Sequence, residues 1–278
     1  MLNLNQPLSP NDMEQIRFMT KLDNLQIQGA QLSDISFLSG LWQLERLILF
    51  NNQIVDVTPL SGLTNLWNLS LHTNQVNNVE PLKTLTNFKQ FSLVGNQVSN
   101  IEPLHKLTNL EHLHLTTNYI ARWQIDEIRA VLPSNCSILH NAPATVTILG
   151  TTYPTDRTTP LNISHQPLSL DDREQIRFMT KLDDLQMDGA QLSNISFLSG
   201  LWQLERLNLF NNQIVDVTPL SGLTNLRLLS LHTNQVNNVE PLKTLTNLER
   251  LWLVANPQLT TAQIDALQSA LPQCQITF

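Results

Sequence analysis

The stretch LWNLSLHTNQVNNVEPLKTL, residues 66–85, decides the fold of this chain. Its pattern LxxLxLxxNxVxxVxPLxxL recurs 22 residues earlier, from Leu44, and 22 residues later, from Phe88. A fixed period of this size, with apolar residues at fixed phases, is typical of proteins whose coils stack in a row. Each leucine is buried only against a neighbouring coil, so no single repeat can fold alone.

Each repeat carries an asparagine where the chain turns away from its expected strand. An amide at this place can satisfy backbone groups inside the turn, which a leucine cannot do. Leucines at fixed phases, with an asparagine that closes the core, predict a leucine-rich repeat solenoid. Seven positions fit this asparagine ladder: Asn52, Asn74, Asn96, Asn118, Asn212, Asn234 and Asn256.

Composition and charge narrow the functional classes. The chain has 278 residues, of which 41% are hydrophobic, and a formal net charge of -7. The hydrophobic content is that of an ordinary soluble globular protein. A nucleic-acid-binding surface is normally basic and clustered, so we expect no nucleic-acid partner. No apolar run approaches the roughly 18 residues that cross a bilayer, so we expect no membrane insertion.

The start of the chain and its cysteines bear on the compartment. Residues 1–10 contain neither a basic region nor an apolar core, so we expect no secretory signal. Two cysteines, Cys136 and Cys274, do not make a disulfide framework. We therefore expect a cytoplasmic protein.

A short helix is expected ahead of the first coil. Residues 1–9 are polar with one proline, and we expect them to be loosely ordered. Ser9 or Asn11 can cap a helix that runs to about Thr20 and covers the open edge of the first coil. The apolar residues expected to turn inward are Ile16, Phe18 and Met19.

Five coils follow in the first array, with starts at Leu22, Leu44, Leu66, Phe88 and Leu110. The last coil runs into residues 124–132, whose apolar spacing is helical and which Pro133 ends. Residues 136–139 are expected to form a closing strand. Together they predict a C-terminal cap, and residues 1–143 a complete array.

The periodicity then disappears and starts again. Threonine and proline dominate residues 144–165, which we interpret as a semi-extended linker with a possible short strand at 146–149. Residues 166–278 repeat the plan with a capping helix from Asp172 and a second C-terminal cap. They contain four coils, which begin at Leu182, Leu204, Leu226 and Leu248. Two capped arrays in tandem predict two domains.

The segment NQIVDVTPLSGL, at residues 52–63 and again at 212–223, resembles the 22-residue repeats of bacterial internalins. This resemblance implies strands on a concave face, tight 3₁₀-like turns on a convex face, and ligand binding by concave side chains. The expected fold is therefore an α/β solenoid of two tandem leucine-rich repeat arrays. Each array would have a parallel concave β-sheet, a 3₁₀ or irregular convex side and helical caps.

Strand alternation assigns the side chains that point outward on the concave face. The leucines of LxxLxLxxN face the core, so the third, fifth and seventh positions face outward. Aromatic residues and arginine often anchor protein interfaces. Isolated exposed aromatics are also common without any function, but here they align across neighbouring strands, which favours an interface. The predicted partner-binding residues are Arg46, Ile48, Phe50, Trp67, His72, Val94, His112 and His114 in the first array, and Arg206, Phe210, Arg227, His232, Arg250, Trp252 and Val254 in the second.

The two arrays can be compared with each other. Residues 12–88 and 172–248 differ at nine positions. Five of these positions lie on or beside the concave strands, which suggests that the two faces bind different surfaces. They are Asn24/Asp184, Gln28/Asp188, Ile48/Asn208, Trp67/Arg227 and Asn68/Leu228.

Chemical sites are hard to place in this pattern. The spacing of His112 and His114 can hold zinc, but no third ligand is evident, so we expect no metal. The cysteines recur at the same place in each cap and are expected to be buried small hydrophobic residues. The sequence has no phosphate-cradling loop, and we expect no cofactor and no enzymatic activity.

The leading hypothesis is a non-enzymatic protein-recognition module whose two arrays engage one partner bivalently or two partners. Two alternatives stay open. The repeats could be the targeting part of a larger effector enzyme, which a further catalytic domain would favour. They could instead belong to a surface or adhesion protein of the internalin type, which a secretion signal would favour.

Overall fold

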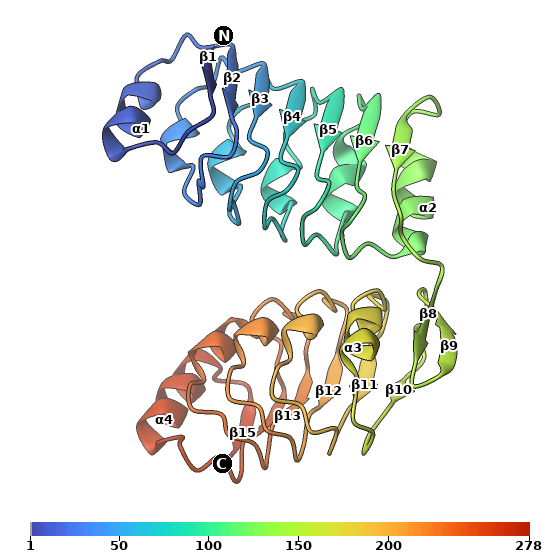
Figure 1. The fold of residues 1–278 in the computed structure, drawn as a ribbon. Helices are drawn as coiled ribbons and strands as arrows, with labels where there is room; N and C mark the ends of the chain where they lie inside the picture. The colour runs from blue at the N-terminus through green and yellow to red at the C-terminus, as the bar shows by residue number, and fades with distance from the viewer. Residues whose placement is uncertain (1) are drawn as a thin grey trace. The chain divides into compact units, whose positions relative to one another are not determined.

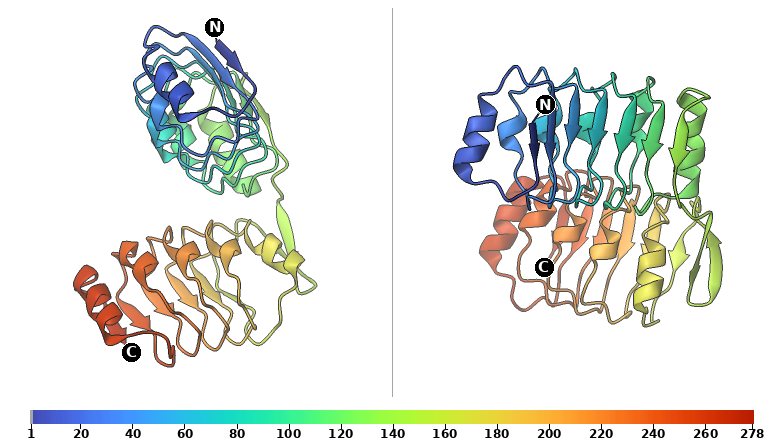
Figure 2. Two further views of the ribbon diagram at one scale, coloured as in Figure 1. Left: turned by 60° about the vertical axis from the view of Figure 1, so that its left-hand side comes forward. Right: turned by 45° about the horizontal axis from the view of Figure 1, so that its top comes forward.

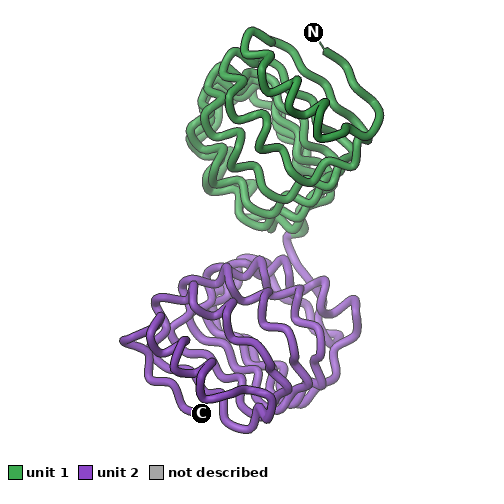
Figure 3. Tube along the Cα trace, turned by 90° about the vertical axis from the view of Figure 1, so that its left-hand side faces the viewer, with its two compact units in different colours: residues 1–143 green, residues 144–278 purple. Residues whose placement is uncertain are grey.

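The computed structural model describes residues 2–278 and divides the chain into two compact units, residues 1–143 (unit 1) and 144–278 (unit 2) (Figure 3). Each unit has its own continuous hydrophobic core. In each, the strands line one face of the coils and the short helical turns line the opposite face (Figure 1; Figure 2). No helix among the described residues has the length and apolar character that a membrane crossing requires.

The sheet of unit 1 has seven strands that pair in chain order, all parallel. In the repeats the register follows the 22-residue period, because Asn24 pairs with Arg46 and Arg46 with Asn68. Side chains of one phase therefore form rows across the sheet. The strands are β1 (Leu2–Leu4), β2 (Asn24–Ile27), β3 (Arg46–Ile48), β4 (Asn68–Ser70), β5 (Gln90–Ser92), β6 (His112–His114) and β7 (Ser137–Leu139).

The convex side of unit 1 consists of single 3₁₀ turns, η1 (Ser36–Leu38), η2 (Thr58–Leu60), η3 (Glu80–Leu82) and η4 (Glu102–Lys106). An aspartate or asparagine two residues before each turn accepts a hydrogen bond from a backbone N–H inside it, as Asp56 does from Thr58 at 2.8 Å. This local bond holds the chain in a tight turn and leaves no room for a longer helix.

Helices close both ends of unit 1, α1 (Pro10–Arg17) and α2 (Arg122–Val131). Ser9 caps α1 and shares a capping box with Asp12, as the sequence indicates. Two expectations are wrong. Residues 2–4 form a strand because the open edge of β2 offers parallel pairing. Phe18 and Met19 lie beyond the end of α1 and are 70% and 42% exposed, so of the three residues expected to face inward only Ile16 is buried.

The asparagine ladder is confirmed at all seven positions, and every member is buried. The amide of Asn74 donates to the carbonyls of Leu49 and Leu71 at 2.9 Å each, and its oxygen accepts from the N–H of Ile54 at 3.0 Å. The residue before each ladder asparagine has a positive φ, for example 54° at Thr73. The ladder thus satisfies the backbone at the point where the chain leaves the strand in a strained conformation.

Unit 2 repeats this plan with a six-stranded parallel sheet, also in chain order. Its strands are β10 (Leu161–Asn162), β11 (Asp184–Gln186), β12 (Arg206–Asn208), β13 (Leu228–Ser230), β14 (Arg250–Trp252) and β15 (Gln275–Thr277). Its convex turns are η5 (Ser196–Leu198), η6 (Thr218–Leu220) and η7 (Glu240–Thr244), and its caps are α3 (Leu170–Ile176) and α4 (Thr261–Ala270).

The expected linker over residues 144–165 is wrong, because this segment belongs to unit 2. It forms an antiparallel hairpin of β8 (Thr145–Ile148) and β9 (Thr151–Pro154), followed by β10 at the sheet edge. The inward residues of β8, Val146 and Ile148, are buried in the core of unit 2. Alternating threonines and aliphatic residues fit a strand with one buried face, so the segment caps the array.

Candidate functional site

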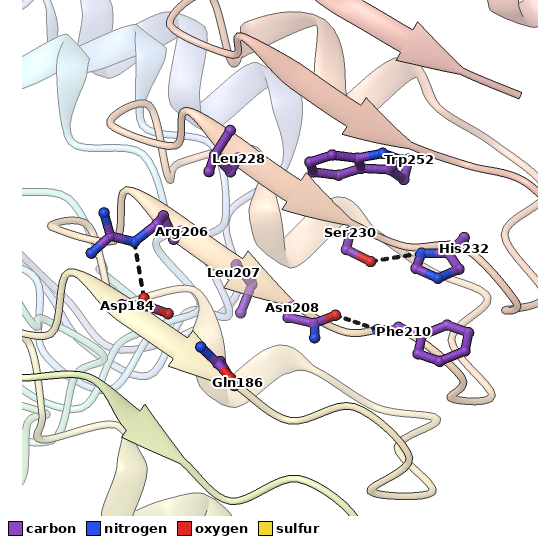
Figure 4. Close-up of a pocket in the computed structure, with 10 residues that line it drawn as sticks. All are labelled: Asp184, Gln186, Arg206, Leu207, Asn208, Phe210, Leu228, Ser230, His232 and Trp252. Atoms are coloured by element: carbon purple, nitrogen blue, oxygen red, sulfur yellow. Dashed lines mark hydrogen bonds and ion pairs between the residues drawn. The ribbon is translucent and has the colours of Figure 1, made fainter.

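A hollow of about 370 Å³ lies on the outward face of the sheet in unit 2. It spans β11 to β14. Outward-facing side chains of these strands form most of its lining, together with Phe210 and His232, which lie two residues beyond the ends of β12 and β13 (Figure 4). The lining residues are Asp184, Gln186, Arg206, Leu207, Asn208, Phe210, Leu228, Ser230, His232 and Trp252.

An ion pair forms one end of this hollow. The guanidinium Nε of Arg206 donates to Oδ2 of Asp184 at 2.9 Å across paired strands. The hydrogen bond and the charge of Asp184 raise the pKa of Arg206. In unit 1, Asn24 stands in place of Asp184, and Nε of the equivalent Arg46 has no hydrogen-bond partner. The carboxylate of Asp184 therefore fixes Arg206 in unit 2, whereas Arg46 at the equivalent position of unit 1 has no such charged partner.

A stacked pair of rings forms the other end. The rings of Phe210 and His232 lie 4.0 Å apart with an interplanar angle of 16°. The hydroxyl of Ser230 and Nδ1 of His232 share a hydrogen bond of 2.8 Å, which fixes the imidazole. Burial lowers the pKa of His232, so the ring is neutral near pH 7. Unit 1 contains the same arrangement, with Phe50 and His72 4.4 Å apart.

The middle of the hollow distinguishes the two units. Leu228 and Trp252 lie diagonally across the adjacent strands β13 and β14, because Leu228 pairs with Arg250 and Ser230 pairs with Trp252. Their side chains supply an apolar wall (Figure 4). Beside them, the amide oxygen of Asn208 accepts a hydrogen bond from the backbone N–H of Phe210 at 3.1 Å.

The equivalent row in unit 1 reads Ile48, Asn68 and Ser92 in place of Asn208, Leu228 and Trp252. A hollow of about 360 Å³ lies over β4 to β6 of unit 1, whereas the strands equivalent to β11 to β14 are β2 to β5. Amides, hydroxyls and imidazoles line it, and Asn68 donates to Gln90 at 2.8 Å across the strands. Its lining residues are Asn68, Leu69, Ser70, Gln90, Phe91, Ser92, His112 and His114.

The structure brings together only part of the predicted binding residues. Arg206, Phe210, His232 and Trp252 line the hollow of unit 2, whereas His112 and His114 line the hollow of unit 1. Phe50 and His72 stack on each other just beyond the ends of β3 and β4.

Other predicted residues lie elsewhere or offer little surface. Ile48 is only 9% exposed, and Val94 and Val254 line neither of these hollows. Arg227 directly precedes the interior strand β13, and it donates to Glu249 at 2.6 Å in a separate polar hollow. Trp67 is the equivalent residue of unit 1 and also lies outside the hollow.

Six lining residues are absent from the predicted set: Gln186, Leu207 and Ser230, which have identical counterparts in unit 1, and three others, Asp184, Asn208 and Leu228. The signal that could have found the last three was present, since all three differ between the otherwise matching arrays. A prediction based on residue type favours aromatics and arginine and omits the short polar and aliphatic side chains between them.

The described residues offer no evident chemical centre. Nowhere in residues 2–278 do three or more His, Cys, Asp or Glu side chains gather as metal ligands would. Burial raises the pKa of the Cys274 thiol to about 11 and also raises the pKa of Cys136. A thiol with a raised pKa is a poor nucleophile at neutral pH. Cys274 is buried as expected, whereas Cys136 is only half-buried and packs against the core of unit 1.

Comparison with known families also indicates the repeat fold that the parallel sheets show. The family described as Leucine Rich repeats (2 copies) matches residues 86–130 and 202–244. These two segments match that family, and the parallel sheets have the fold of a leucine-rich repeat solenoid. Both matched segments lie within the coils that form the parallel sheets. A search of curated protein sequences finds no match to this chain.

Solved structures of leucine-rich repeat proteins are similar to this one. An internalin (inlF) of Listeria monocytogenes is 24% identical, with 94% of this chain and 74% of that chain covered and a TM-score of 0.35. An internalin C2 of the same species is 26% identical, with 89% and 84% covered and a TM-score of 0.36. A leucine-rich repeat protein of Leptospira interrogans is 19% identical, with 98% and 81% covered and a TM-score of 0.38.

Proposed function

We propose that this protein is a non-enzymatic recognition module that binds protein partners through the outward faces of its two sheets, with a different surface for each unit. The observation that carries this proposal is the pair of hollows. Both lie on the sheet face of their unit, both are about the size that one or two side chains fill, and their linings differ in chemistry.

The hollow of unit 2 suits an apolar side chain of a partner. Leu228 and Trp252 provide contact area, and the ring of Phe210 adds to it. Interface anchors of this kind fill pockets that exclude water. Arg250 stands next to Leu228 in the sheet register and is exposed, so it can pair with an acidic group beside the anchor.

The hollow of unit 1 suits a polar segment. Gln90, His112 and His114 present donors and acceptors, and Ser70 and Ser92 add hydroxyls. A partner that leaves an apolar group here gains less from burial than it does in unit 2. We therefore infer that the two units bind chemically different segments, on one partner or on two.

The serine and histidine pairs in the two units support binding and not catalysis. His232 uses Nδ1 for Ser230 and packs its ring against Phe210. The nucleophile-base-acid arrangement of hydrolases also needs a third group that orients the base. Here a hydroxyl and an aromatic ring fix the imidazole instead, which preorganises a surface.

The test is a binding measurement on the full chain. A peptide-display library selected against the chain supplies a ligand, and binding is then compared among Phe210→Ala, Trp252→Ser and Leu228→Asn. The last two introduce the residues of unit 1. An anchor typically contributes about 2 kcal/mol, so a ligand of unit 2 should bind roughly 30-fold more weakly to Trp252→Ser.

The matched control is Lys243→Ala on the convex turn η7, which should leave the affinity unchanged. The proposal fails if all ligands tolerate the three sheet-face variants and lose binding to the convex one.

A further inference from the structure

One stretch of ten residues occurs twice in this chain with the same sequence and very different exposure. Residues 14–23 and 174–183 both read EQIRFMTKLD. In unit 1, Phe18 is 70% exposed and Met19 is 42% exposed, whereas in unit 2 Met179 and Thr180 are fully buried. The sequence of the stretch cannot cause this difference, so its surroundings must.

The surroundings differ by the hairpin of β8 and β9. Val146 and Ile148 from β8 share one buried cluster with Met179, and Phe178 packs against this cluster. The hairpin is also tied to the capping helix, because the backbone N–H of Leu149 donates to Oδ1 of Asp172 at 2.8 Å. In unit 2 the hairpin therefore packs against the capping helix α3 and shares its core with the residues that follow this helix.

The hairpin of β8 and β9 presents an apolar side to the core of unit 2. Along β8 the side chains alternate between exposed threonine and buried aliphatic residues. Leu149 and Gly150, with φ of 51° and 76°, join the strands in a two-residue turn of the type that suits a tight hairpin. An isolated two-stranded hairpin is marginal in water, so contact with the helix end stabilises it.

Unit 1 presents the features that hold the hairpin in unit 2. Asp12 is the counterpart of Asp172 and forms the same capping box, with Ser9 in place of Ser169. Met13 replaces Arg173, which makes the surroundings of α1 more apolar. The exposed residues Phe18, Met19 and Thr20, which we name the open cap face, match the residues that unit 2 covers.

We propose that the open cap face of unit 1 is a docking surface for an antiparallel β-hairpin with a branched aliphatic inner side, of the kind that β8 and β9 supply in unit 2. This site is separate from the sheet faces and goes beyond the function proposed for them. The partner hairpin places two aliphatic side chains on Met19 and Phe18, and its turn donates a backbone N–H to Asp12.

The test adds a copy of the hairpin ahead of β1. A copy of residues 144–160 replaces Met1, so that it precedes Leu2 as the original precedes Leu161, the residue in the equivalent register. Oxidation of each methionine by hydrogen peroxide is followed by mass spectrometry, since exposed thioethers oxidise faster than buried ones. We expect oxidation of Met19 to slow at least about tenfold, to the rate of the buried Met179.

The matched control carries the same extension with aspartate in place of its valine and its isoleucine, and it should leave Met19 as reactive as in the starting chain. A second variant tests the premise independently. Val146→Asp together with Ile148→Asp in the original hairpin should expose Met179 and raise its oxidation rate.

Three outcomes overturn the proposal. The first is an extended chain in which Met19 remains reactive, and the second is a Met179 that stays protected when its hairpin is disrupted. The third is protection of Met19 in the starting chain that rises with protein concentration, because the occupant would then be a second copy.

Discussion

Replacement of one ladder asparagine by leucine should destabilise unit 1 by an amount that the structure allows us to work out. Asn74 makes three buried hydrogen bonds of 2.9–3.0 Å, to Leu49, Leu71 and Ile54. The two carbonyls are shared along the ladder, because Leu49 also accepts from Asn52 and Leu71 also accepts from Asn96. In Asn74→Leu each carbonyl keeps one donor, but the N–H of Ile54 loses its acceptor.

A buried donor without a partner costs about 1–3 kcal/mol, and each carbonyl that keeps one bond costs less. We therefore expect a loss of about 3 kcal/mol in the free energy of unfolding. Asn52→Leu should cost more, because the oxygen of Asn52 accepts from two backbone N–H groups, those of Ala30 and Leu32. The order of the two variants follows from the number of donors that lose their partner.

Urea unfolding followed by circular dichroism gives both values, and amide hydrogen exchange at Ile54 reports the local loss directly. The control is Asn77→Leu, an exposed asparagine three residues further on, which should change stability by less than about 0.5 kcal/mol. Equal losses at Asn74 and Asn77 would refute the assignment of the ladder.

Three further predictions follow from the same structure. A fragment 144–278 should unfold cooperatively, and a fragment 166–278 should be less stable because it lacks the hairpin; equal urea midpoints would contradict this. Burial lowers the pKa of His72 and His232, so the unfolded state binds more protons than the folded state below about pH 6.5. The urea concentration at the unfolding midpoint should therefore decrease when the pH is lowered from 7.5 to 5.5, and an increase would contradict this prediction. With a pKa of about 11, Cys274 has roughly 0.1% thiolate at pH 8, so iodoacetamide should label it only after unfolding, and rapid labelling of the folded chain would show that the thiol is accessible.

Much of the fold could be predicted because the repeat couples local and distant constraints. A leucine at a fixed phase must meet the leucine one period away, so the 22-residue spacing gives the strand register directly. The asparagines could be assigned for the same reason, since only an amide of that length reaches two carbonyls and an N–H in successive coils. The convex turns form where Asp56 and the equivalent Asp or Asn of each repeat accept a hydrogen bond from the backbone of the turn.

The caps were harder to predict because each occurs once per array. The hairpin turn at Leu149 and Gly150 lacks the Asn-Gly or Asp-Gly pair that usually indicates a tight turn, and β8 gives only two alternations. Pairing of β1 depends on an exposed edge of β2, which no local pattern reveals. Threonine and proline content therefore indicates a linker where tertiary contacts produce a cap.

The sequence predicts which residues of the candidate site face outward from the sheet, but it does not predict where they form a hollow. Alternation shows that residues such as Arg206 and Trp252 point outward. Which of them meet depends on side-chain pairing, since Arg206 bonds to Asp184 whereas Nε of the equivalent Arg46 has no hydrogen-bond partner. Short residues set the depth of the hollow, and residue type alone does not show this.

The position of the differences between the arrays explains how one scaffold can hold two surfaces. A leucine of the core touches coils on both sides, and a ladder asparagine bonds to two of them, so a change at either place disturbs several neighbours. An outward residue such as Leu228 or Asn208 contacts solvent and its row, so its replacement alters the lining without a change in register. Unit 2 accordingly has Leu228 and Trp252 on its sheet face where unit 1 has Asn68 and Ser92, while every strand keeps its partner in both units. In this protein the residues that define the fold and the residues that define the surface are therefore separate sets, and recognition can change while the solenoid stays the same.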